Sequence, residues 1–318
     1  MKELTLFAPA TVANVSCGFD VLGFCLDAIG DTMIFRTVPK KGVRIVKITG
    51  QDLPLENHKN VAGVAVLALL KKIDTNIGFE IEIHKNIKPG SGIGSSAASA
   101  AGAVFGVNKL LGEPFTVKEL IPFAMEGERL ASGTAHADNV APALLGGFTL
   151  VRSYAPLDVI KIHTPPELYA AIVHPQIEIK TADARAILNK TVSLQETTTQ
   201  LGNLGGLISG LYTENYPLIS RSLHDEIVEP YRSVLIPEFD KVKDAALDAG
   251  ALGSGISGSG PSIFALCKGK EIAERAAQAM ASIYAQTAID FEVHVSKINT
   301  DAIKIQPSEM GDYHDSFE

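Results

Sequence analysis

The sequence has few cysteines, no long apolar run and no excess of basic residues, and each shortage excludes a class of protein. Its three cysteines, Cys17, Cys25 and Cys267, are scattered along the chain, which argues against a disulfide framework or a zinc site and favours a reducing compartment. The longest apolar run, Val61–Leu70, is too short to span a bilayer. The first residues lack the apolar segment of a signal peptide. We therefore expect a cytoplasmic protein with no membrane partner.

The charge argues against a nucleic-acid partner. The formal net charge is -8 at pH 7, and no stripe of lysine and arginine alternates with aromatic residues. Hydrophobic residues make up 46% of the chain and charged residues 20%, as in an ordinary soluble globular protein. The length of 318 residues suits about two domains.

Local patterns divide the chain into two α+β halves. Pro165 and Pro166 interrupt the pattern and mark a boundary, so we expect an N-terminal domain at 1–165, a C-terminal domain at 166–306 and a polar tail at 307–318. The C-terminal half alternates strand and helix, which indicates helices on one face of a sheet. The expected strands are 4–7, 33–38, 42–49, 79–84, 148–163, 168–173, 262–266 and 291–296. The expected helices are 59–72, 97–107, one opening at 116 or after Pro122, 181–188, 201–212, 220–226, 239–249 and 271–284.

The chain is organised around the stretch 89–99, which reads Pro-Gly-Ser-Gly-Ile-Gly-Ser-Ser-Ala-Ala-Ser. It lies between an expected strand and an Ala-rich helix. Glycine tolerates positive φ and has no Cβ, so successive N–H groups can turn toward an anion. The helix adds free N–H groups and the positive end of its dipole. The pattern predicts a phosphate cradle, and the alternative is a flexible turn before a closely packed helix.

Two common nucleotide motifs do not fit these glycines. A P-loop needs lysine after its last glycine, and no lysine follows this loop. A dinucleotide fingerprint fails because Ser95 stands where the third glycine belongs. A second glycine loop, 250–261, matches that fingerprint in letters but follows a helix and precedes a strand, which is the wrong context. We expect it to bring its backbone close to the first loop or to a substrate.

Two polar clusters are candidates for ligand contacts. Asn14 and Asp20 lie in a segment rich in turn residues, and His136, Asp138 and Asn139 lie among small residues. Asn14 and Asp20 can face an ammonium or hydroxyl group of a ligand. Alternatively, Asn14 and Asp20 only cap turns and His136 only bonds to the backbone. The second cluster lacks the histidine pairing of zinc proteases.

Three motifs in order resemble the GHMP small-molecule kinases, a family that includes galactokinase and mevalonate kinase. They are Pro9-x4-Asn14-x3-Gly18-Phe-Asp20, Gly90-Ser-Gly92-Ile-Gly94-Ser-Ser-Ala-Ala and Gly255-Ile-Ser-Gly-Ser-Gly-Pro261. The resemblance covers residues 4 to 306 and implies a two-domain α+β fold. The N-terminal domain would resemble domain 2 of ribosomal protein S5, and the C-terminal domain would be ferredoxin-like. Segments 14–20, 136–142, 180–185 and 229–232 resemble the branch that phosphorylates L-homoserine on the path to threonine.

The resemblance also implies an ATP site and a magnesium site. Mg²⁺ would be held by the Ser96 hydroxyl, the Glu128 carboxylate and phosphate oxygens, which suits an ion that takes few protein ligands. The implied ATP-binding residues are Asn60, near the adenine edge, and Pro89, Gly90, Ser91, Gly92, Ile93, Gly94, Ser95, Ser96, Ala97, Ala98 and Ser99, around the phosphates.

For L-homoserine, the resemblance implies that Arg185 and Arg232 bind the carboxylate, since a guanidinium grips a carboxylate at two points. Asp20 would accept the ammonium group. The hydroxyl and the polar flank would be held by Asn14, His136 and Asn139.

One departure within the family bears on mechanism. Mevalonate kinases carry a catalytic Asp seven residues before a Gly-Gly pair, and here Asn139 stands at that position. An amide is no base at neutral pH, so we expect direct in-line transfer that relies on positioning and charge neutralisation. The expected catalytic residues are Asn139, Glu128 and Arg232. Asp138 as a displaced base is the rival.

Two other functions stay open at this stage. The chain could be a GHMP-type kinase acting on a different small alcohol, or a non-catalytic binding module. Ser96, Glu128 and the two glycine loops argue against the second. A homodimer is implied by the resemblance alone.

Overall fold

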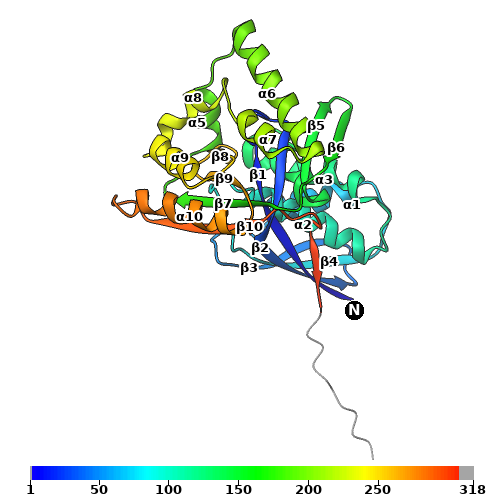
Figure 1. The fold of residues 1–318 in the computed structure, drawn as a ribbon. Coiled ribbons are helices and arrows are strands. Elements are labelled where there is room, and N and C mark those ends of the chain that lie inside the picture. The colour runs from blue at the N-terminus through cyan, green and yellow to red at the C-terminus, as the bar shows by residue number, and fades with distance from the viewer. Residues whose placement is uncertain (1, 308–318) are drawn as a thin grey trace, which may run out of the picture.

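The computed structural model describes residues 2–307, so all but the first residue of the expected tail lies outside it. The chain folds around two β-sheets (Figure 1). The strands are β1 Glu3–Ala13, β2 Leu22–Val38, β3 Gly42–Thr49, β4 Gly78–His84, β5 Phe148–Tyr154, β6 Leu157–Ile162, β7 Leu168–Pro175, β8 Gly253–Ile256, β9 Ile263–Lys268, β10 Phe291–Lys297 and β11 Lys304–Gln306. The helices are α1 Val61–Leu70, α2 Ser95–Leu110, α3 Val117–Ser132, α4 Val140–Leu145, α5 Thr181–Ala186, α6 Leu194–Thr213, α7 Tyr216–Ser222, α8 Glu229–Arg232, α9 Phe239–Asp248 and α10 Lys270–Tyr284, with a 3₁₀ turn at Ser233–Leu235.

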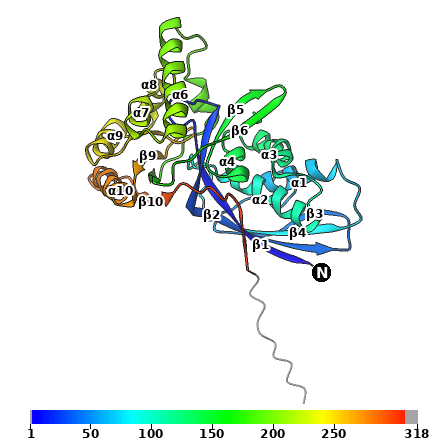
Figure 2. The same cartoon turned by 45° about the vertical axis from the view of Figure 1, so that its right-hand side comes forward.

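The first sheet has the strand order β11-β1-β2-β4-β3, and β5 joins β2 to β6. Helices α1 to α4 gather on one of its faces (Figure 2). The alanines and glycines of α2 let it lie close to the sheet, because a Cβ on Gly102 would stand 2.5 Å from the sulfur of Met33. Helix α3 starts at Val117 with the expected capping box and runs through Pro122, so the predicted start is confirmed and the alternative of a later start is wrong.

The first two strands are much longer than expected. Strand β1 continues from Phe7 to Ala13, and β2 starts at Leu22 and not at Met33. The residues between read as a turn-rich loop in the sequence. Two features allow the strands to continue through these residues. The register between β1 and β2 shifts between Pro9 and Thr11, and such a bulge tolerates proline. Glycine at position 23 lets β2 pass close to the Asp138 backbone, because a Cβ on Gly23 would stand 1.8 Å from the Asp138 carbonyl oxygen.

The second sheet is antiparallel, in the order β10-β7-β9-β8. Helices α9 and α10 pack on one face of it, as expected, and bury residues such as Tyr284 and Phe239. Helices α5 to α8 lie toward the opposite end of the molecule from β11 (Figure 1). The predicted α+β architecture with two sheets is confirmed. Within the described chain, no helix combines the length and apolar character needed to cross a bilayer.

The two sheets share the larger of two hydrophobic cores, and the smaller one lies between the second sheet and helices α9 and α10. The ring of Phe24 on β2 lies 5.0 Å from that of Phe148 and 5.9 Å from that of Phe264 on β9. The chain passes from the first sheet to the second between β6 and β7, at the two expected boundary prolines. The chain later returns to the first sheet, where β11 pairs with the outer edge of β1. This pairing covers a strand edge that would otherwise be open. The expected second domain therefore contributes a strand to the first sheet.

Candidate active site

One cavity of about 580 Å³ lies between the two glycine loops, the start of α2, the end of α3 and α5. Ser91, Ile93, Ala97 and Ala98 are buried and support the first loop from behind. Most of the residues expected at the site line the cavity: Asn14, Asp20, Pro89, Gly90, Gly92, Gly94, Ser95, Ser96, Ser99, Glu128, His136, Asn139, Arg185 and Arg232.

The first glycine loop has the backbone that its sequence predicts. The φ angles of Gly90, Gly92 and Gly94 are 75°, 84° and 70°. A Cβ on Gly92 would stand 2.7 Å from the carbonyl oxygens of Ser257 and Gly260, so only glycine lets the two loops meet. The Ser257 hydroxyl donates to the Gly92 carbonyl at 2.7 Å. The expectation that the second loop approaches the first is confirmed. Helix α2 starts directly after Gly94 without a side-chain cap, which leaves N–H groups for a ligand.

Glu128 points a buried carboxyl toward the start of α2. Its Oε1 has no hydrogen-bond partner within the described chain. Burial raises its pKa to about 7 from an ordinary value near 4.5, although the Ser96 hydroxyl and the charge of Lys85 lower it. A carboxyl oxygen left without a partner beside a hydroxyl and a phosphate cradle fits a hard cation such as Mg²⁺.

Lys85 is a site residue that the sequence reading missed. Its Nζ contacts the Asp31 carboxylate and donates to the Ser95 carbonyl and the Ser99 hydroxyl, both at 3.0 Å. Asp31 also accepts from the Ile87 N–H at 2.9 Å. This buried ion pair ties the base of the first glycine loop to α2. The sequence signal was a lysine directly after a strand of alternating apolar and polar residues. The partner of this lysine, Asp31, lies 54 residues away in the sequence, so the lysine alone does not indicate the ion pair.

At the other end of the cavity, the expected ammonium acceptor and an expected carboxylate anchor contact each other. The Arg185 guanidinium donates to the Asp20 carboxylate at 2.9 to 3.1 Å and lies 3.1 Å from His136 Nε2. Burial lowers the pKa of His136 more than Asp20 raises it, which keeps the imidazole neutral at neutral pH. Because Asp20 and Arg185 form an ion pair, their charges neutralise each other in this structure.

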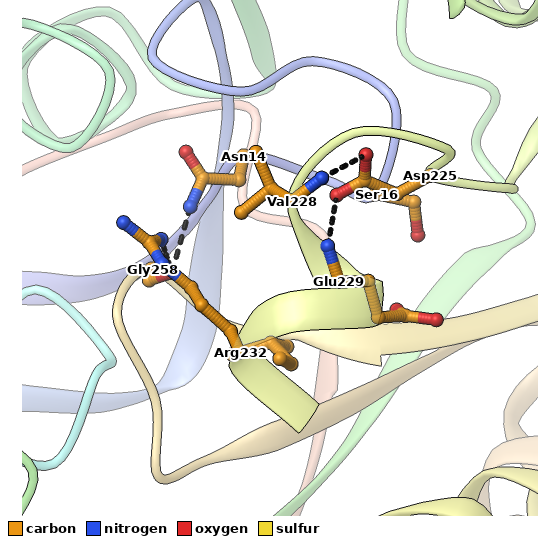
Figure 3. Close-up of a pocket in the computed structure, with 8 residues that line it drawn as sticks. Asn14, Ser16, Asp225, Val228, Glu229, Arg232 and Gly258 are labelled. Carbon is orange, nitrogen blue, oxygen red and sulfur yellow. Dashed lines mark hydrogen bonds between the residues drawn. The ribbon is translucent and has the colours of Figure 1, made fainter. Parts of the chain in front are cut away.

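The second arginine is fixed by backbone carbonyls, and its contact with Gly258 is shown in Figure 3. Arg232 donates to the Ala184 carbonyl at 2.9 Å and to the Gly258 carbonyl at 3.1 Å. The Asn14 amide donates to that same Gly258 carbonyl at 2.7 Å. The Phe19 ring lies 5.1 Å from the Arg232 guanidinium and 5.4 Å from that of Arg185. One aromatic ring thus contacts both guanidinium groups at the same end of the cavity.

Asn139 and Asp138 lie between the two ends. Asn139 Oδ1 accepts from the Thr11 hydroxyl at 2.7 Å, so its amide NH₂ is the group left for a ligand. Asp138 is 4% exposed, and its Oδ1 has no partner among residues 2–307. Burial, with the charges of Asp20 and Glu128, raises the pKa of Asp138 to about 7.

Asn60 opens α1, as expected, and its side chain is bonded within the fold. Its side chain caps α1 by accepting from the N–H groups of Ala62 and Gly63, and it donates to the Pro54 carbonyl at 2.8 Å. It does not appear in the cavity wall, where Leu53 and Val61 lie instead. Asn at the start of a helix is a standard cap, and this local signal was available in the sequence.

Comparisons with known proteins agree with this geometry. The GHMP kinases N terminal domain matches residues 60–147, and the GHMP kinases C terminal domain matches residues 200–286. The chain is 51% identical to a homoserine kinase of Chloroherpeton thalassium over 292 residues, which are 88% of this chain and 92% of that one. It is 47% identical to a homoserine kinase of Chlorobaculum tepidum over 319 residues, 96% of this chain and 98% of the relative.

Solved structures give the same result. A crystal structure of a homoserine kinase from Cytophaga hutchinsonii superposes with a TM-score of 0.93 at 54% identity, covering 96% of this chain and 98% of that one. A mevalonate kinase of L. major superposes with a TM-score of 0.70 at 15% identity, covering 94% and 96%, which shows a shared fold. This chain belongs to the GHMP kinase family, among the homoserine kinases.

Proposed function

We propose that the protein transfers the γ-phosphoryl group of ATP to the side-chain hydroxyl of L-homoserine, the phosphorylation step on the path to threonine. One observation carries the proposal: a single cavity has a phosphate-binding loop at one end and two arginines on Phe19 at the other. Relatives about half identical over most of their length are homoserine kinases. The three cysteines are free and buried, which suits a reducing compartment, and we place the reaction in the cytoplasm.

At the nucleotide end, the first glycine loop and the start of α2 bind the phosphates of ATP. Ser96 and Glu128 are the residues that hold Mg²⁺, which supplies charge neutralisation on the phosphate oxygens when bound. Lys85 fixes the loop through its contacts with Asp31 and the Ser95 carbonyl. Asn60 acts on this end only indirectly, by capping α1.

At the amino-acid end, the substrate carboxylate binds the guanidinium groups of Arg185 and Arg232. The substrate carboxylate must compete with Asp20 for the Arg185 guanidinium, because Asp20 and Arg185 form an ion pair in the structure. Asp138 has a buried carboxyl oxygen without a partner, so we assign the ammonium group to Asp138 together with Asp20. Asn14 and His136 hold this end in place, since the Asn14 oxygen accepts from the Asp20 N–H at 3.0 Å.

The hydroxyl lies between the two ends, next to the Asn139 amide. Asn139 orients this hydroxyl for in-line attack and takes no proton. The transition state of phosphoryl transfer is loose, so positioning and charge neutralisation carry most of the rate. Asp138, the buried residue before Asn139, is the rival as a base, and its pKa near 7 suits that role.

The proposal is tested by measuring ADP release with a panel of small alcohols. L-Homoserine should give turnover well above the ATPase background, and mevalonate, L-threonine and galactose should give little. A better alcohol than homoserine would favour the second function, a different kinase of the family. No turnover with any alcohol, despite ATP binding, would favour a binding module.

A further inference from the structure

The first glycine loop lacks the lysine that completes a P-loop. In a P-loop that lysine reaches the β- and γ-phosphates of the bound nucleotide. Here the first basic residue after Gly94 is Lys109, in the last turn of α2, too far along the helix to reach a phosphate at its start. Phosphoryl transfer depends on neutralising the charge of the transferred group. A cation from another segment of the chain would supply what the loop lacks.

Four basic side chains line the cavity, and three of them are already bonded. Lys85 is held in its buried ion pair, with a side chain 2% exposed. Arg185 is paired with Asp20, and Arg232 donates to two backbone carbonyls. The fourth, Lys180, is exposed, and within the described part of the chain its ammonium group makes neither an ion pair nor a side-chain hydrogen bond. Its charge is therefore available to a ligand in the cavity.

The segment that carries Lys180 contacts both glycine loops. A Cβ on Gly90, in the first loop, would stand 4.0 Å from the Glu178 side chain. On the other side of Lys180, the Thr181 hydroxyl lies 3.3 Å from the Ser259 hydroxyl in the second loop. Lysine carries its ammonium group on a flexible four-carbon stem. Lys180 thus starts beside the phosphate cradle and can extend over it.

Local stability does not explain a lysine at this position. Lys180 is the N-cap residue of α5, and its side chain makes no capping hydrogen bond. Helix starts favour Ser, Thr, Asp and Asn, and the helix dipole opposes a positive charge there. Departures from such local rules are expected at functional sites. A contact with a bound anion would account for the lysine.

We propose that Lys180 binds the γ-phosphate of ATP and stays in contact with this group as it moves to the alcohol. The inference rests on the proposed function and adds a catalytic residue to it. The bond from the γ-phosphorus to the ADP oxygen breaks as the bond to the homoserine oxygen forms, and the hydroxyl proton passes to phosphate or solvent. Lys180 neither gains nor loses a proton, and its charge stabilises the phosphate oxygens throughout.

Helix α5 then carries one cation for each substrate. Lys180 lies at its start and Arg185 in its last turn, about 7.5 Å apart along the helix axis. Arg185 faces the end of the cavity assigned to the substrate carboxylate, and Lys180 faces the glycine loops. The phosphoryl group moves between these two positions, so one short helix orients the two substrates toward each other.

Titration calorimetry with Mg²⁺-ATP and Mg²⁺-ADP, without any alcohol, tests the contact. Lys180→Met should weaken ATP binding about tenfold or more, since it removes a charge-assisted hydrogen bond. It should leave ADP binding nearly unchanged, because ADP has no γ-phosphate. Lys180→Arg should recover most of the ATP affinity, since it keeps the charge and the donors. Thermal melts confirm that each variant is folded.

Lys88→Met is the matched control, because it removes the same charge just before the first loop. Lys88 is exposed and donates to the Gln176 side chain at 2.7 Å, and it is absent from the described cavity wall. This variant should change the affinity for neither nucleotide. Equal losses of ATP and ADP affinity in Lys180→Met, or an ATP affinity that stays the same, would overturn the proposal.

Steady-state kinetics locate the effect within the reaction. Lys180→Met should lower kcat about tenfold or more with little change in the KM for homoserine, because the lysine acts on the phosphate. A raised KM for homoserine at normal kcat would assign Lys180 to the amino-acid end and contradict the inference. Since the calorimetry contains no alcohol, a wrong substrate assignment does not alter its result, so the two proposals fail separately. A parent that binds neither nucleotide would overturn both.

Discussion

Replacing Glu128 by Gln should make the free protein more stable and the enzyme much less active. The substitution keeps the shape of the side chain and removes its charge. Burial raises the pKa of Glu128 from near 4.5 to about 7, so the folded protein binds this proton more tightly than the unfolded chain does. Stability therefore falls as the pH rises from about 4.5 to about 7. Above pH 7 the full penalty of the buried charge is present, and Gln does not carry it.

The size of the effect follows from the pKa. A difference of roughly 2.5 pH units corresponds to about 3 kcal/mol. At pH 8 the variant should melt several degrees above the parent, and at pH 4 the two should melt together. Turnover with ATP and homoserine should fall by about a hundredfold or more, because the group that holds Mg²⁺ has lost its charge.

The assay pairs thermal melts at pH 4 and pH 8 with initial rates at millimolar Mg²⁺. Glu126→Gln is the matched control, since Glu126 lies on the same helix with a side chain 44% exposed, and should change neither quantity. Near-normal turnover of Glu128→Gln would refute the metal assignment. An equal melting difference at both pH values would refute the argument from the buried charge.

Three further predictions concern the rest of the cavity. Asp138→Asn should lower kcat/KM for homoserine by roughly 10- to 100-fold and leave the weaker substrate 4-hydroxybutyrate, which has no ammonium group, unchanged; an equal loss with both would identify Asp138 as the base. Arg185→Leu should lower kcat/KM for homoserine by a similar factor but spare 3-aminopropan-1-ol, which lacks the carboxylate, and an equal loss with both alcohols would contradict carboxylate binding. Gly94→Ala should reduce both nucleotide affinity by calorimetry and kcat, because its Cβ would stand 2.1 Å from the Thr11 hydroxyl. Gly133 also has a positive φ, but a Cβ there would meet nothing within 4 Å, so Gly133→Ala should leave nucleotide affinity and kcat unchanged. Equal losses in the two variants would refute the steric argument.

Local signals predicted the parts of the site that lie close together in sequence. The backbone of the first glycine loop follows from three glycines between a strand and a helix. The capping box at Thr116 was also readable. The same kind of signal at Ser193 and Glu196 starts α6 seven residues before the expected Leu201, and it was missed because the Thr-rich stretch reads as a loop.

Contacts between segments far apart in the chain could not be predicted from the sequence. Asp20 and Arg185 are 165 residues apart, and nothing in either segment shows that they form an ion pair. The glycine at 23 looked like a turn residue, whereas it lies in a strand that passes close to the Asp138 backbone. A glycine can serve a turn or a close approach, and only the tertiary structure decides between the two.

The central claim is that this protein moves a phosphoryl group from ATP to the side-chain oxygen of L-homoserine. Phosphorus NMR of the parent enzyme with ATP, Mg²⁺ and homoserine tests it most directly. The γ-phosphate signal should decrease as a phosphomonoester signal increases, and the new signal should show coupling to the protons on carbon 4 of homoserine. Accumulation of inorganic phosphate at the same rate with and without homoserine would contradict the account.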